Sequence, residues 1–293
     1  MFNKAARWAL GLAAALALAA CAQQPSPARP ALWLVEGPGG QKAWLFGTIH
    51  ALSQPYDWKS QTIAAALAQS DRMILEVADV GNDAATARVF AQLAQGGPHP
   101  PLAERVTVQD RDDLARELKA DEIAPGSLDP YDTWAAALMI AQAQARNDRQ
   151  DSGNGIDRAL AADYRRPIGE LEGAEVQLAI FDALPEAQQR ALLHSVIEED
   201  GADREAKVRA LEQAWASGDV AELAKVSDAE TFGDPLLREA LLVGRNRTWA
   251  DRLVAMLSSR ARPFVAVGAA HLAGPDGLPS MLAARGYTVT RLQ

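Results

Sequence analysis

Segments typical of β-strands lie at the two ends of the chain, and this placement constrains the fold more than any other feature. The strand-like runs are Leu32–Val35, Ala43–Phe46, Arg72–Val77, Pro263–Val267 and Tyr287–Thr290. Between them, residues 84–259 are rich in Ala, Leu, Gln and Glu, which predicts helices, interrupted by one strand at about residues 167–172. We therefore expect an α/β fold whose mixed central sheet is built from N- and C-terminal segments, with a large helical insertion.

The first 20 residues are predicted to be a signal peptide and not part of the fold. Lys4 and Arg7 precede an apolar run from Ala9 to Ala20, which is shorter than the roughly 20 apolar residues of a spanning helix. The run ends at Cys21, the only cysteine of the chain, and its Leu-Ala-Ala-Cys ending resembles the lipobox of bacterial lipoproteins. The resemblance implies that Cys21 carries the lipid; an ordinary signal peptide with a chance cysteine is the alternative.

The segment after Cys21 predicts where the protein resides. Residues 21–30 contain three prolines and no apolar pattern, which is typical of an extended tether, and residues 31–293 are expected to form one domain. Ala22 follows the cysteine, and by similarity to lipoprotein sorting in Gram-negative bacteria this favours the periplasmic face of the outer membrane. A net charge of −9 argues against binding to nucleic acid. An acidic protein also gains nothing from anionic lipid surfaces, so the expected membrane contact is the N-terminal lipid alone.

Two histidines follow apolar strands in the same way, at opposite ends of the chain. Gly47 is followed by His50, and Gly268 by His271, each with two residues between. A glycine permits a tight turn where the strand ends, and ligands of open α/β sheets bind at the carboxyl ends of the strands. The two imidazoles are predicted to share a functional site, where they bind a metal or act in acid–base chemistry; structural histidines near strand ends are the alternative.

Glu76 ends an apolar strand, where a buried carboxylate needs a partner or a metal ion. Together with His50 and His271, it would form a set of two imidazoles and one carboxylate that suits Mn, Co, Fe or Zn. The alternative is that Glu76 reaches solvent at the end of its strand.

Arg245 and Asp157 are two further polar candidates. Arg245 precedes Asn246 in a long helical stretch and is predicted either to stabilise an oxyanion or to form a plain surface ion pair. Asp157 begins a helical segment, where capping of the helix is the expected role. His99 and His194 are expected to stand outside any site.

In their order along the chain, these motifs resemble the TraB/GumN/Tiki family, in particular its bacterial GumN-like lipoproteins. The matching residues are Leu32-Trp33, Phe46-Gly47-Thr48-Ile49-His50, Leu75-Glu76, Gly155-Ile156-Asp157, Leu171-Glu172 with Gln177, Arg245-Asn246 with Trp249, Val267 to Leu272, Gly277-Leu278 and Gly286-Tyr287. The resemblance implies a fold like those of Tiki, erythromycin-esterase and ChaN proteins. It also implies that Gly47, Gly268, Glu172 and Asn246 line the cleft.

The same resemblance implies an activity. Tiki members look like Mn- or Co-dependent proteases that use two Gly-x-x-His motifs and a glutamate, which match His50, His271 and Glu76 here. We expect a metal-dependent hydrolase of peptides or small molecules in which Glu76, His50 and Arg245 are catalytic. The alternatives are a metal-free, esterase-like hydrolase with His50 as base, and a non-catalytic envelope lipoprotein that binds metal or haem. The sequence predicts neither the substrate nor the oligomeric state.

Overall fold

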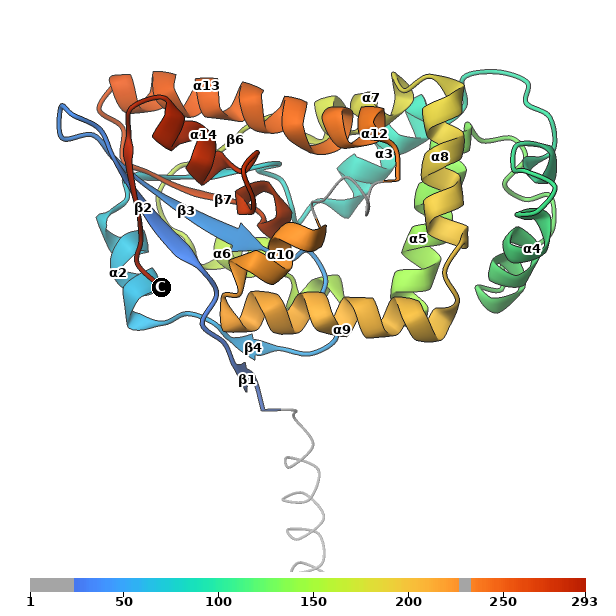
Figure 1. The fold of residues 1–293 in the computed structure, drawn as a ribbon, viewed down its shortest axis with the longest axis horizontal. Helices are drawn as coiled ribbons and strands as arrows, with labels where there is room; N and C mark the ends of the chain where they lie inside the picture. The colour runs from blue at the N-terminus through green and yellow to red at the C-terminus, as the bar shows by residue number, and fades with distance from the viewer. Residues whose placement is uncertain (1–23, 227–232) are drawn as a thin grey trace, which may run out of the picture.

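Six strands form the central sheet of the computed structural model, which describes residues 24–226 and 233–293 (Figure 1). The predicted signal peptide and Cys21 lie outside the described residues. The sheet runs in the order β6–β5–β7–β3–β2–β8. The strands are β2 (Leu32–Glu36), β3 (Lys42–Thr48), β5 (Arg72–Leu75), β6 (Ile168–Glu170), β7 (Pro263–Gly268) and β8 (Thr288–Arg291).

The register of the sheet brings the two ends of the chain together. β2 and β3 form an antiparallel hairpin, and its turn uses Gly40 at a φ of 78°, which favours glycine. β3 then pairs in parallel with β7, so that Thr48 lies beside Gly268, although 220 residues separate them in the sequence. β8 closes the edge beyond β2. The mixed α/β sheet that the sequence predicts from both termini is confirmed.

Helices cover both faces of the sheet because alternate strand residues point to opposite sides. On one face, Phe46 and Phe264 pack with Trp215 of α9; on the other, Leu45 and Val265 belong to the core cluster that contains Trp249 of α13. The helices that contribute to these two cores are α2 (Gln61–Gln69), α6 (Ile156–Asp163), α9 (Gly201–Ser217), α10 (Val220–Val226), α13 (Gly244–Ser258) and α14 (Leu278–Ala284).

The helical insertion builds a lobe of its own, which extends to the right of the sheet in Figure 1. Its apolar centre lies along α5, whose Trp134 is fully buried, and α5 packs extensively on α8. The helices of this part are α3 (Asp83–Leu93), η2 (Leu102–Glu104), α4 (Arg111–Ala120), α5 (Thr133–Asn147), α7 (Ala174–Asp182) and α8 (Glu186–Ile197).

Short elements complete the described chain. β1 (Ser26–Pro27) pairs with β4 (Tyr56–Asp57), and the amide of Arg29 donates to the carbonyl of Ala216 in α9. The later half of the predicted tether is thus hydrogen-bonded to the domain. The remaining elements are η3 (Ser152–Asn154), α12 (Pro235–Arg238), the π-helical turn η4 (Glu239–Val243) and η5 (Ala269–Leu272). Within the described residues, we find no helix with the length and apolar character that a membrane span requires.

Candidate functional site

The paired strands β3 and β7 deliver both glycine motifs to one edge of the sheet. Close packing explains why glycine is present at each position. A Cβ on Gly47 would come within 3.1 Å of Ala269, and a Cβ on Gly268 would come within 3.2 Å of the Glu76 carboxylate. The backbone amide of Gly268 also donates to Glu76 Oε1 at 2.7 Å.

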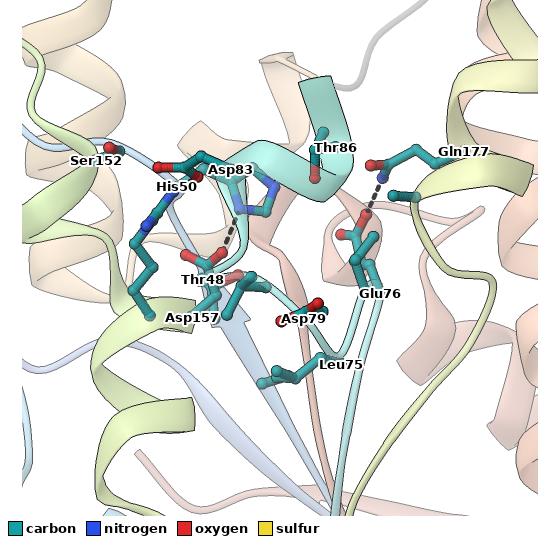
Figure 2. A pocket seen from close by; sticks show the side chains of 15 residues that line it. Thr48, His50, Leu75, Glu76, Asp79, Asp83, Thr86, Ser152, Asp157 and Gln177 are labelled. Atoms are coloured by element: carbon teal, nitrogen blue, oxygen red, sulfur yellow. Dashed lines mark hydrogen bonds and ion pairs between the residues drawn. The ribbon is translucent and has the colours of Figure 1, made fainter. Parts of the chain in front are cut away.

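His50 forms a pair with Asp157, as Figure 2 shows. His50 Nδ1 lies 3.0 Å from Asp157 Oδ2; the carboxylate can only accept, so the ring nitrogen donates. Asp157 is buried in the first turn of α6, where the helix dipole favours a negative charge. The hydrogen bond to Asp157 raises the pKa of His50 above its usual value. The His50 side chain itself remains 62% exposed, so it can meet a substrate.

The loop that carries His50 is fixed against the start of α6. The Ile156 amide donates to the Ile49 carbonyl at 3.0 Å, and a Cβ on Gly155 would lie 2.3 Å from the His50 carbonyl oxygen. Only a glycine lets α6 begin this close to the loop. The Gly-Ile-Asp sequence at residues 155–157 thus combines the close approach with the carboxylate that His50 needs.

Glu76 is buried in the wall of the pocket, so the alternative in which it reaches solvent is wrong. Besides the Gly268 amide, its carboxylate accepts hydrogen bonds from Gln177 Nε2 at 3.0 Å and from Arg245 Nη2 at 2.7 Å. Burial acts to raise the pKa of Glu76, but the positive charge of Arg245 and the hydrogen bond from the Gly268 amide act against it, and the pKa of Glu76 lies below its usual value. Glu76 is therefore an ionised, fully hydrogen-bonded carboxylate.

His271 lies deeper than His50 and is held as a neutral ring. Its Nδ1 is 2.6 Å from Asn246 Oδ1, and the Asn246 amide nitrogen donates to two carbonyls, those of His271 and Asp276. These contacts orient the Asn246 amide, so that His271 Nδ1 carries the hydrogen and Nε2 accepts from Arg245 Nη1 at 3.2 Å. Burial lowers the pKa of His271 to about 3.

Arg245 is the centre of the buried network. Its guanidinium contacts Glu76, Glu172 and His271, and its Cζ lies 4.6 Å from the ring centroid of Trp249. Arg245 therefore forms largely buried ion pairs with Glu76 and Glu172, and the alternative of a plain surface salt bridge is wrong.

A pocket of about 230 Å³ opens between His50 and Glu76. Figure 2 shows His50 and Asp157 on one side and Glu76 and Gln177 on the other. Thr48 and Asp157 line this pocket, and their atoms Thr48 Oγ1 and Asp157 Oδ1 are buried without a hydrogen-bond partner among the described residues. This wall therefore has hydrogen-bonding capacity that the described protein groups do not use.

Four residues were predicted to line the cleft: Gly47, Gly268, Glu172 and Asn246. None of them is among the residues that line the pocket of Figure 2. The two glycines lie in the strands beneath it, Asn246 is fully buried against His271, and Glu172 faces a separate pocket beside Trp249. These residues support the site from behind.

The predicted metal ligands His50, His271 and Glu76 are each hydrogen-bonded to other side chains in this structure. Glu76 and the Nε2 of His271 are already occupied by hydrogen-bond donors, Arg245 among them. In the part of the chain that the structure describes, no group of three or more His, Cys, Asp or Glu side chains is arranged to hold a metal ion. The divalent ion, whether Mn, Co, Zn or Fe, remains a prediction from the sequence.

Three residues of the site have roles that the sequence did not predict. Asp157 does not cap α6, because Gly155 holds that position and Asp157 turns to His50. Gln177 and Trp249 bind Glu76 and Glu172 through their side-chain N–H groups. Their presence in the family motifs was the only signal, since each contact joins segments far apart in the sequence.

Comparison with known proteins gives the family of this chain. The chain is similar to the uncharacterized protein YbaP of Shigella flexneri and of Escherichia coli (strain K12), in each case with 29% identity over 250 residues, which is 84% of this chain and 89% of the relative. No solved structure matches the chain significantly. The profile of the TraB/PrgY/gumN family matches residues 31–291, and the chain therefore belongs to the TraB/PrgY/gumN family.

Proposed function

We propose that this protein is a hydrolase of peptides or small esters, in which His50 is the general base and Asp157 orients it. The observation that carries the proposal is the 3.0 Å hydrogen bond between His50 Nδ1 and Asp157 Oδ2, on a ring that is otherwise exposed to the pocket. A carboxylate that fixes the tautomer of a histidine is a recurrent part of hydrolytic sites.

The pair gives His50 the properties of a base. Since Nδ1 donates to Asp157, the lone pair is on Nε2. Asp157 raises the pKa of His50, so that the ring accepts a proton more readily, and the carboxylate stabilises the imidazolium that forms.

The proposed reaction has two proton transfers. His50 Nε2 takes a proton from a water molecule while the water oxygen bonds to the substrate carbonyl carbon. His50 then returns that proton to the leaving nitrogen or oxygen as the bond from the carbonyl carbon to the leaving group breaks. Arg158 lines the same pocket and could bind the carbonyl oxygen, whereas all five N–H groups of Arg245 are engaged elsewhere.

The metal-dependent version remains a second proposal, for which the His50–Asp157 contact also gives support. Histidine ligands of metals commonly donate their other ring nitrogen to a carboxylate, as His50 does. A lipid anchor on Cys21 would place either activity at the cell envelope.

The proposal is tested with the full chain, purified in a mild detergent and assayed on libraries of fluorogenic peptides and p-nitrophenyl esters. General-base catalysis contributes about 10²–10⁴-fold, so His50→Gln should lower turnover by that factor and Asp157→Asn by a smaller one. His50→Gln should keep the circular dichroism spectrum because the His50 side chain is largely exposed, and Asp157→Asn should keep it because the amide has the size of the carboxylate.

His194→Gln is the matched control, since His194 is an exposed histidine of the helical lobe. Assays with and without a chelator separate the two versions. Turnover that survives both the chelator and His50→Gln would refute the two proposals together.

A further inference from the structure

We infer that Glu212 and Trp215 of α9 are positioning residues, which hold His50 in the place where it meets Asp157. Neither residue is among those that line the pocket, so both act on the site through the loop that carries His50. Their effect on turnover rests on the proposed hydrolysis, whereas their effect on the contact between His50 and Asp157 can be measured without a substrate.

The His50 loop is hydrogen-bonded to α9 three residues before and three residues after the histidine. Trp215 Nε1 donates to the carbonyl oxygen of Gly47 at 2.8 Å. Ser53 donates twice to Glu212, from its amide to Oε1 at 2.7 Å and from its hydroxyl to Oε2 at 2.6 Å. Glu212 and Trp215 are three positions apart in α9, so they lie on the same side of the helix. One face of α9 therefore fixes both ends of the loop.

The other side of the loop contacts the segment that leads to Asp157. The Leu52 amide donates to the Asp151 carbonyl at 3.3 Å, and the Asp151 amide donates to the Leu52 carbonyl at 3.1 Å. Asn154 Nδ2 also donates to the Leu52 carbonyl, at 3.3 Å. The loop is thus held between α9 and the start of α6. Because 62% of the His50 side chain is exposed, packing does little to orient it, and its place depends on this backbone.

The burial of Glu212 indicates that this residue serves the loop and not the core. Glu212 is 4% exposed, and a carboxylate that is so deeply buried costs free energy unless hydrogen bonds compensate. Ser53 supplies a donor to each of its two oxygens. Ala214 and Trp215 fill the adjacent buried positions of α9, so packing against the sheet does not require an acid there. The contact with the His50 loop explains why a carboxylate occupies this position.

The helix that holds the loop is itself fixed at its other end. Arg204, in the first turns of α9, binds Glu117 and Asp148 of the helical lobe, each at 3.0 Å. The 17 residues of α9 span about 25 Å, and Figure 1 shows the helix running from below the sheet to the lobe. A site residue keeps its geometry best when rigid elements support it, and α9 provides such a support for His50.

The tautomer of His50 tests this positioning without a substrate. It is read from ¹⁵N-histidine shifts of the full chain at pH 9. In the wild type, the ring hydrogen should be on Nδ1, because that atom donates to Asp157. Glu212→Ala should let the loop move, so that the hydrogen distributes over both ring nitrogens. Glu212→Gln should keep the wild-type signal, because the Ser53 hydroxyl can accept from the new amide while the Ser53 amide donates to its oxygen.

Two further variants complete the tautomer experiment. Glu205→Ala, at an exposed glutamate of the same helix, is the matched control and should keep the wild-type signal. Ser53→Ala removes one of the two hydrogen bonds from the exposed side of the contact, so it answers the question even if Glu212→Ala does not fold. It should change the tautomer in the same direction as Glu212→Ala, but less.

Turnover gives a second measurement on the same variants. Misplacement of a catalytic group by about 1 Å costs about 10²-fold, so Glu212→Ala should lower kcat by up to that factor with little change in KM, and Glu212→Gln should restore it. A wild-type tautomer in both Ser53→Ala and a folded Glu212→Ala would overturn the inference, as would a Glu212→Gln that behaves like Glu212→Ala. Absence of turnover in every form would refute the proposed hydrolysis alone, because the tautomers still decide the role of Glu212.

Discussion

Replacement of Arg245 by alanine should be one of the most destabilising single changes in this protein. The side chains of Arg245, Glu76 and Glu172 are 12%, 7% and 6% exposed, so the change leaves two buried carboxylates without their cation. Removal of one partner from a buried ion pair costs about 3–5 kcal/mol. For a chain of this size, that corresponds to a fall in Tm of about 6–10 °C. Denaturation in urea and by heat, followed by circular dichroism, measures both quantities.

The control for this stability loss is an ion pair at the surface. Arg285 binds Asp251 at 2.6 Å, but Asp251 is 72% exposed, so Arg285→Ala should cost about 0–1 kcal/mol. Glu172→Gln added to Arg245→Ala should recover part of the lost stability, because it removes one of the two buried charges. The reasoning would be refuted if Arg245→Ala and Arg285→Ala had equal effects, or if the double variant were less stable than Arg245→Ala.

Three further predictions concern pH and packing. Asp157→Asn should cost more stability at pH 6 than at pH 9. Asp157 raises the pKa of His50 above 6.5, and the stabilising effect of the pair is lost as pH rises through that higher value. Urea unfolding at both pH values measures the cost, and an equal cost would contradict the prediction. The difference in the free energy of unfolding between the wild type and Glu76→Gln should narrow as pH falls below 4.5. The folded protein lowers the pKa of Glu76, so the stability that the ionised carboxylate contributes is lost as it becomes protonated. A constant difference between pH 7 and pH 3 would refute this. Gly155→Ala should cost about 1–3 kcal/mol and shift the NMR signals of His50, because the new Cβ meets a backbone oxygen, whereas Gly97→Ala, with open space around it, should do neither.

The sheet could be predicted from the sequence because its information is local. The runs that form β2 and β3 are apolar and separated by a glycine-rich turn, and the run that forms β7 is apolar over its whole length. The same pattern placed Gly47 and Gly268 at strand ends. Their proximity followed from the general rule that ligand sites lie at the carboxyl ends of parallel strands.

The partners within the site could not be predicted in this way. Asp157 resembles an ordinary residue of a first helical turn, and its contact with His50 joins positions 107 residues apart. Nothing in the spacing of Arg245 indicates that a buried guanidinium contacts both Glu76 and His271. Such contacts depend on how the helices of the insertion return to the sheet, and their apolar patterns are too similar to specify that packing.

The pairing of β3 with β7 determines when, during synthesis of the chain, the site can form. β3, the strand that leads to His50, finds its partner β7 only after residue 268 has been synthesised. Pairing of such distant segments is slow, because a long loop must close before the contacts form. A nascent chain therefore contains His50 before its strand has a partner, and truncation by about 30 residues removes β7 and His271.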